Sequence, residues 1–229
     1  METAAAFNQL GVACKFGGRF DEAAAAYARA LPVAEAAAGA EPDLLAALLH
    51  NLGGLAHSRG RYIEAEACAR RGVTIREKHG DACDVAADLA ALAAILEGQE
   101  RWVESEELYR RALAIWEAEG DDYETAMTLN GLAAVIRFGG RPTEAEPLFR
   151  RALSMVEAER GPRHPDSSTV RNNLAMLLNA TGRDLKALPL LEQAAKDLDA
   201  MLGANHPATR DVRANRDRIV KGLRTSATS

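Results

Sequence analysis

Aromatic residues are scarce in this chain. Among its 229 residues, only 5% are Phe, Trp or Tyr. A core with so few rings has to be built from small and medium aliphatic side chains, and the abundant alanine and leucine head the ranking of helix-forming residues. β-Branched residues, which favour strands, are sparse. The composition therefore predicts an all-α protein.

Other features are missing as well, and each excludes a class of function. Acidic residues outnumber basic ones by 33 to 28, giving a net charge of −5, so the basic face that nucleic acids require is not expected. No apolar run reaches the length of a membrane span, and the first residues lack the charged and apolar regions of a secretory signal. The cysteines Cys14, Cys68 and Cys83 are too few and too scattered for a disulfide framework. We therefore expect a cytoplasmic protein.

What the chain does contain is an internal repeat. Five segments align without gaps, at steps of 42, 40, 40 and 42 residues, and one arginine marks the same position in each: Arg19, Arg61, Arg101, Arg141 and Arg183. A sixth, partial copy starts at His206–Pro207, 42 residues after His164–Pro165. A fixed period of this length predicts a repeat architecture.

Each copy predicts two helices joined by a turn. In the first helix, apolar residues recur with helical spacing, as in Leu129, Leu132, Ala133 and Ile136. The turn carries glycine in four copies and Glu100 in the third. The second helix carries a small residue and, four positions later, a larger one: Tyr27, Tyr109, Phe149 and Leu191, with Ala69 as the exception. Because a single helix pair cannot bury its apolar face alone, the pairs are expected to stack into a solenoid.

Three second-helix segments and one connecting segment carry a family resemblance: "GRYIEAEACARRGV", "RWVESEELYRRALAI", "GRPTEAEPLFRRALSM" and "GPRHPDSSTVRNNLA". The pattern resembles the tetratricopeptide repeat, and more closely its long-period form in kinesin light chains and bacterial relatives. The resemblance implies a right-handed α-solenoid of about five helix pairs plus a C-terminal capping helix. Its first helices would line a concave groove that holds extended or helical peptide segments. We expect one array over residues 1–222, with repeats at 4–38, 44–79, 84–119, 123–160 and 166–202, a cap helix at 207–222 and a disordered tail at 223–229.

Motifs for catalysis or metal binding are missing from the sequence. It has no phosphate-binding loop, nucleophile elbow or zinc-binding helix motif. His50 and His57 lie seven residues apart, which would suit a metal pair, but no third ligand is near, so we interpret them as polar groove residues. His164 and His206 each precede a proline, which marks a helix entry. We interpret the recurring arginine and glutamate three residues apart as a structural pair, and we expect no catalytic residue, cofactor or metal.

One face of the first helices is expected to contact a ligand. At about 100° per residue, Asn172 lies about 100° from the core direction and Asn173 nearly opposite to it. The Asn172 position is polar in four copies, and asparagine can both donate to and accept from a peptide backbone. The predicted groove contacts are Asn8, Lys15, His50, His57, Asn130, Arg137, Asn172, Asn173, Met176 and Asn179. Alternatively, the asparagines hydrogen-bond between neighbouring first helices, and the two roles are compatible.

The sequence thus predicts a protein–protein interaction module. It would bind a peptide or protein segment in the groove without catalysis, and it would not bind nucleic acid or membrane. One alternative is a regulatory sensor that takes a small peptide or metabolite in the same groove. The other is an enzyme, with the region of His50 and His57 as its site. The identity of the partner and the oligomeric state are left open.

Overall fold

The computed structural model describes residues 2–226 and consists there of eleven helices and no strand. This confirms the predicted all-α class. The helices are α1 Glu2–Phe16, α2 Phe20–Ala36, α3 Pro42–Ser58, α4 Tyr62–His79, α5 Ala82–Glu97, α6 Trp102–Glu119, α7 Asp122–Phe138, α8 Pro142–Arg160, α9 Pro165–Ala180, α10 Asp184–Leu202 and α11 Pro207–Ser226.

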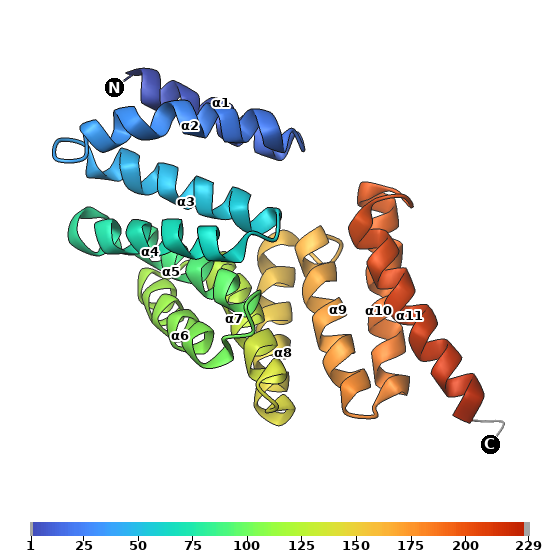
Figure 1. Ribbon diagram of the computed structural model, residues 1–229. Coiled ribbons are helices and arrows are strands. Elements are labelled where there is room, and N and C mark those ends of the chain that lie inside the picture. Colours follow the sequence, from blue (N-terminus) through green and yellow to red (C-terminus); the bar gives the residue numbers. More distant parts are fainter. Residues whose placement is uncertain (1, 227–229) are drawn as a thin grey trace. The chain divides into compact units, whose positions relative to one another are not determined.

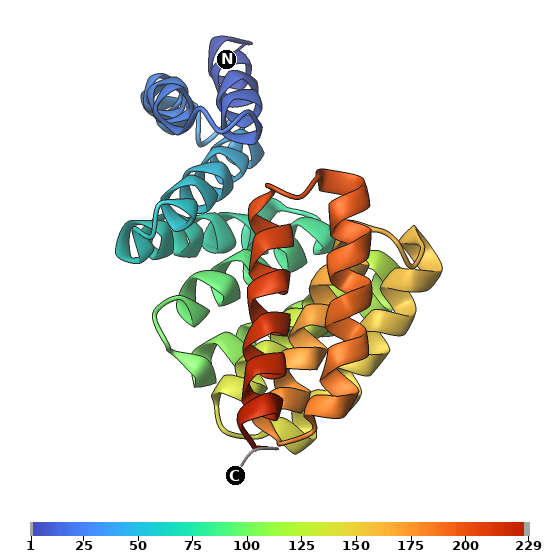
Figure 2. The same cartoon turned by 90° about the vertical axis from the view of Figure 1, so that its right-hand side faces the viewer.

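The chain divides into two compact units, residues 1–119 and 120–229. The first unit holds three helix pairs, α1 to α6, and the second holds two pairs, α7 to α10, followed by α11. Within each unit every helix packs against the preceding and the following one (Figures 1 and 2). The first helices of consecutive pairs also touch, α1 with α3, α3 with α5, α7 with α9 and α9 with α11. The first helices therefore form one face within each unit.

The turns inside the pairs follow the predicted glycine pattern. Gly18, Gly60, Gly140 and Gly182 have φ angles of 70°, 71°, 83° and 72°, which glycine adopts without steric cost. The third turn reaches the same conformation with Glu100, at φ 59°. Because a side chain disfavours this region, the α5–α6 turn carries backbone strain that the other turns lack.

Small residues at fixed positions bring the two helices of each pair close together. The first small position of the second helix is fully buried in all five pairs: Ala23, Ala65, Ser105, Ala145 and Ala187. Four residues later, Tyr27 is also fully buried, and a Cβ on Gly11 would lie 2.2 Å from its ring. Packing this tight requires glycine at that point of α1.

The histidines before α9 and α11 have the predicted structural role. His164 Nδ1 accepts a hydrogen bond from the backbone N–H of Asp166 at 3.3 Å, and His206 Nδ1 accepts one from Ala208 at the same distance. Each side chain thus caps the N-terminus of a helix that begins with proline. The prediction of a helix entry at these positions is confirmed.

The predicted structural pairs between arginine and glutamate are also present. Each ion pair joins two residues three positions apart at the start of a second helix: Arg19–Glu22, Arg61–Glu64, Arg101–Glu104 and Arg141–Glu144. Such exposed pairs each contribute on the order of 0.5 kcal/mol, so they refine the helix starts rather than decide the fold.

The C-terminal helix is longer than predicted. The sequence predicts a cap helix that ends at residue 222, but α11 continues to Ser226. Thr225 donates a hydrogen bond to the carbonyl oxygen of Gly222 at 2.8 Å, which holds this last turn. The prediction of a disordered tail is therefore wrong for residues 223–226, and residues 227–229 lie outside the described part of the chain.

Candidate functional site

Asparagine pairs link the first helices of neighbouring repeats. In the first unit, Asn51 Nδ2 on α3 donates to Asn8 Oδ1 on α1 at 2.9 Å. In the second, Asn173 Nδ2 on α9 donates to Asn130 Oδ1 on α7, and Asn215 Nδ2 on α11 donates to Asn172 Oδ1 on α9, both at 3.0 Å. We call these three contacts the asparagine rungs. They provide the hydrogen bonds between first helices that the sequence offered as an alternative role.

The two rungs of the second unit leave part of their hydrogen-bonding capacity unused. In the rung between Asn130 and Asn173, no partner is present among residues 2–226 for the amide nitrogen of Asn130 or for the side-chain oxygen of Asn173. Both residues are half-buried, so these groups still reach solvent. A donor and an acceptor side by side match the N–H and C=O groups of an extended peptide. Linking the helices therefore does not prevent the rungs from contacting a ligand.

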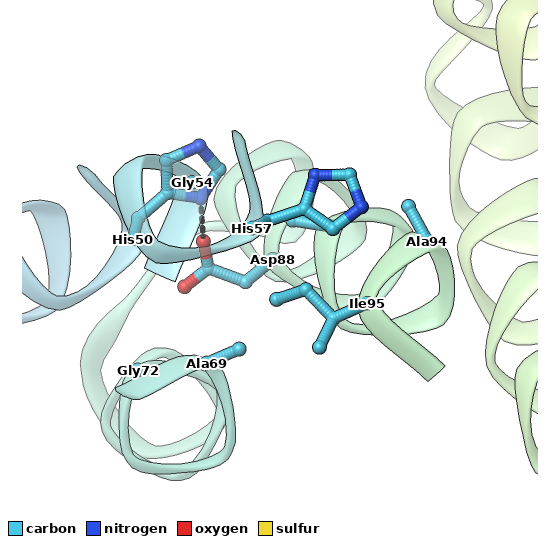
Figure 3. Close-up of a pocket in the computed structure, with 9 residues that line it drawn as sticks. His50, Gly54, His57, Ala69, Gly72, Asp88, Ala94 and Ile95 are labelled. Atoms are coloured by element: carbon cyan, nitrogen blue, oxygen red, sulfur yellow. Dashed lines mark hydrogen bonds and ion pairs between the residues drawn. The ribbon is translucent and has the colours of Figure 1, made fainter. Parts of the chain in front are cut away.

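A buried acid lies beside His50 in the first unit. Asp88 on α5 is 5% exposed, and its Oδ1 lies 2.6 Å from Nδ1 of His50 on α3. The second oxygen is buried without a hydrogen-bond partner among the described residues. His50, Asp88 and their neighbours line a cavity of about 110 Å³ between α3, α4 and α5 (Figure 3).

Two further predicted groove residues lie at this cavity. His57 lines it, and burial, followed by the positive charge of Lys15, lowers the pKa of His57 below 6.5. The Lys15 amine of α1 lies against α3 at Gly54, where a Cβ would be only 2.7 Å from Nζ. Burial also lowers the pKa of Lys15. Lys15, His50 and His57 are therefore brought together in the first unit.

The repeat profile of a known family covers most of the chain. The tetratricopeptide repeat profile matches residues 2–78, 85–158 and 124–200. The chain belongs to the tetratricopeptide repeat family. No curated protein matches its sequence.

Solved tetratricopeptide repeat structures share this fold at low sequence identity. A Podosopora anserina protein, described as a kinesin light chain with nearly identical TPR-like repeats, has a TM-score of 0.69 at 19% identity, over 86% of this chain and 96% of that one. BtubC (BKLC) of P. vanneervenii has a TM-score of 0.65 at 20% identity, over 87% and 90%. The Rap conjugation gene regulator of plasmid pLS20, in complex with the Phr* peptide, reaches 0.73 at 17%, over 91% and 55%.

The remaining predicted residues lie in the second unit, where Arg137 and Asn179 contact residues close to them in the chain. Arg137 stacks on the ring of Phe138, with its guanidinium carbon 4.0 Å from the ring centre. Asn179 donates to Asp184 Oδ1 at 2.8 Å, across the turn between α9 and α10. Met176 is half-buried on α9. Asn179 therefore bonds within its own turn and takes no part in the rungs.

Three residues that contact predicted groove residues are absent from the sequence prediction: Asn51, Asn215 and Asp88. The sequence prediction compares the repeat position of Asn172, whereas Asn51 and Asn215 lie at the next position, that of Asn173. These two residues complete two of the rungs. Asp88 occupies a position held by Leu48, Thr128 and Val170 in other copies. When the copies are aligned, Asp88 is the one acid at this position, and an acid at a core position indicates a special role.

No metal centre accompanies these groups. Among the described residues, no cluster of three His, Cys, Asp or Glu side chains has metal-binding geometry. Of the cysteines, Cys14 is buried and Cys83 is exposed. Within residues 2–226 no helix combines the length and apolarity needed to cross a bilayer.

Proposed function

We propose that this tetratricopeptide repeat protein is a non-enzymatic interaction module that binds an extended peptide or protein segment along its first-helix faces. The asparagine rungs are the observation that carries the proposal. In the second unit they present paired donors and acceptors at the spacing of the repeat, and these can bind a peptide backbone whatever its side chains.

The small residues beside the polar positions support the same function. Ala134 follows the polar Asn130 by one turn in the second unit, and Ala94 follows Ala90 at the same repeat positions in the first. Short side chains there leave the space that a ligand backbone needs to approach a helix. At Gly54 the corresponding space is taken by the Lys15 amine. The cytoplasmic location, the single array over residues 1–222 and the boundaries of its repeats remain part of this proposal.

A regulatory sensor is the second candidate. The Rap regulator of plasmid pLS20, which has this fold, was solved in complex with a peptide. A short peptide that pairs with both members of a rung would tie two neighbouring first helices together. Because adjacent repeats contact only their neighbours, such a tie would change the geometry between repeats. A sensor would respond to a free peptide, whereas a scaffold would hold a segment of a larger protein.

A random twelve-residue peptide library displayed on phage tests the proposed function. Panning against the full chain is expected to enrich peptides whose synthetic copies bind in calorimetry. Asn130→Ala with Asn172→Ala should weaken peptides that protect α7 and α9 from hydrogen exchange. The matched control is Glu192→Ala with Lys196→Ala, two exposed positions of the second helix α10. Failure to enrich any binding peptide, or equal loss with the control, would contradict the proposal.

A further inference from the structure

The cavity between α3, α4 and α5 arises from one alanine. In the other pairs, the repeat position of Ala69 carries Tyr27, Tyr109, Phe149 or Leu191. The Tyr27 ring packs directly against Gly11 of its own pair, and Gly53 is the residue equivalent to Gly11 in the second pair. Because Ala69 lines the cavity, a ring at position 69 would occupy it.

The cavity combines apolar walls with one unsatisfied acid. Ala69, Ala91, Ala94 and Ile95 supply the apolar surface. At the other end, the unpartnered Asp88 Oδ2 turns toward Gly72, where a Cβ would lie 3.4 Å from it (Figure 3). A buried carboxylate oxygen without a donor is destabilising, and an incoming donor would relieve that cost.

Lys15 supplies an unpaired charge of the opposite sign on the same face. Its half-buried amine contacts α3 at Gly54, which also lines the cavity, and no carboxylate in the described part of the chain forms an ion pair with it. A ligand carrying a single positive charge would be attracted to Asp88 but repelled by Lys15. A ligand that carries both signs would satisfy both groups.

We propose that the cavity receives a lysine or arginine side chain of the bound segment, with the cationic group on Asp88 Oδ2 and a neighbouring acidic group of the same segment on Lys15. This inference rests on the proposed function and specifies its ligand in the first unit. The aliphatic stem of the basic residue lies along Ala91, Ala94 and Ile95. A charge-assisted hydrogen bond to a desolvated carboxylate is stronger than one from a neutral donor, which favours a basic anchor over a phenol or an alkyl group.

The experiment uses the peptides enriched by panning against the full chain. Those that protect α3 and α5 from hydrogen exchange are expected to share a lysine or arginine, with Asp or Glu within a few residues. Replacing that lysine by norleucine keeps the stem and removes the charge, and it should weaken binding at least tenfold. On the Asp88→Asn variant the same replacement should change affinity less than twofold.

Two further variants test the cavity and Lys15 separately. Ala69→Tyr restores the residue type of the neighbouring pairs, and Gly53 on α3 matches the Gly11 on which the Tyr27 ring lies. This variant should keep or raise the melting temperature and lose binding of the basic-anchor peptides. Lys15→Met should weaken those peptides but strengthen versions in which the acidic residue is replaced by alanine. The matched control is Glu107→Gln, an exposed charge on α6.

The outcomes separate this inference from the proposed function. If no peptide binds, the proposed function fails and this inference fails with it. If peptides bind but their anchor is aromatic or alkyl, or if the norleucine substitution costs the same affinity on wild type and Asp88→Asn, the basic-anchor inference alone is overturned. Unchanged peptide binding by Ala69→Tyr would also overturn it, and that variant leaves the Asp88 charge in place.

Discussion

Asn173 on α9 donates a hydrogen bond to Asn130 on α7, 43 residues earlier in the chain, with 3.0 Å between Nδ2 and Oδ1. The repeat step between these copies is 42 residues, so the partners are offset by one position. Each asparagine costs its helix about 0.5 kcal/mol relative to alanine. A net hydrogen bond contributes about 1 kcal/mol, which is enough to offset much of that cost.

Removing one partner of this rung should therefore lower the free energy of unfolding more than removing both. We expect Asn173→Ala to lower the free energy of unfolding by about 0.5–1 kcal/mol, because the Asn130 amide loses its partner. The double variant Asn130→Ala with Asn173→Ala should be close to wild type, since two alanines improve helix propensity. Urea unfolding of the four proteins in a double-mutant cycle measures the coupling. A single variant more stable than wild type would show that the rung contributes nothing.

The strained turn between α5 and α6 offers a stabilising substitution. Glu100→Gly should raise the free energy of unfolding by about 0.5–1 kcal/mol, because glycine adopts a positive φ without a Cβ clash. The converse change Gly140→Ala, at φ 83°, should lower it by a similar amount. Both are measured by urea denaturation. An unchanged or lower stability of Glu100→Gly would mean that the Glu100 side chain compensates for the strain.

Breaking a buried ion pair in the second unit should lower the free energy of unfolding more than breaking any rung. Arg171 is 6% exposed and donates to Asp197, which is 3% exposed, at 3.1 Å. Arg171→Leu leaves the acid buried and should cost about 3–5 kcal/mol. Adding Asp197→Ile should recover most of this loss, because other copies carry leucine and isoleucine at these positions: Leu49, Leu89 and Leu129; Ile75 and Ile115. Thermal melts of both variants measure this, and a double variant no more stable than Arg171→Leu would contradict it.

Stability of the first unit should depend on pH through Glu66. Burial acts to raise the pKa of Glu66, but hydrogen bonds from Gln99, Arg70 and Arg101 outweigh it and lower the pKa to about 2. Because this value lies below the ordinary 4.5, ionised Glu66 stabilises the folded state above pH 4.5. That contribution is lost as the pH falls from 4.5 toward 2.

The difference in urea midpoint between wild type and Glu66→Gln should accordingly shrink between pH 6 and pH 2.5. The control is Glu107→Gln, an exposed position on α6, whose difference from wild type should stay small throughout. A Glu66→Gln difference that does not change with pH would show that the carboxylate contributes no net stabilisation.

The helix pairs and their turns could be predicted from the sequence because they depend on the spacing of residues close together in the chain. Apolar residues at helical intervals and the glycine at residues 18, 60, 140 and 182 are properties of single copies. The partner of Asn172 was not predictable in the same way, because it depends on how α9 crosses α11. That crossing shifts the facing residue by one position, to Asn215. The contact of Asp88 depends on packing as well, since its partner His50 belongs to the preceding copy, although the acid itself stands out in the sequence among core positions.

The doublet Asn172–Asn173 connects α9 in both directions along the chain, since Asn173 reaches back to α7 and Asn172 reaches forward to α11. A repeat with this doublet therefore contains both the donor for the preceding first helix and the acceptor for the following one. If residues 166–207 were duplicated in tandem, the second copy's Asn173 equivalent would meet the first copy's Asn172 without any new side chain. Gene duplication could thus lengthen the chain by whole repeats while every new junction received its own hydrogen bond.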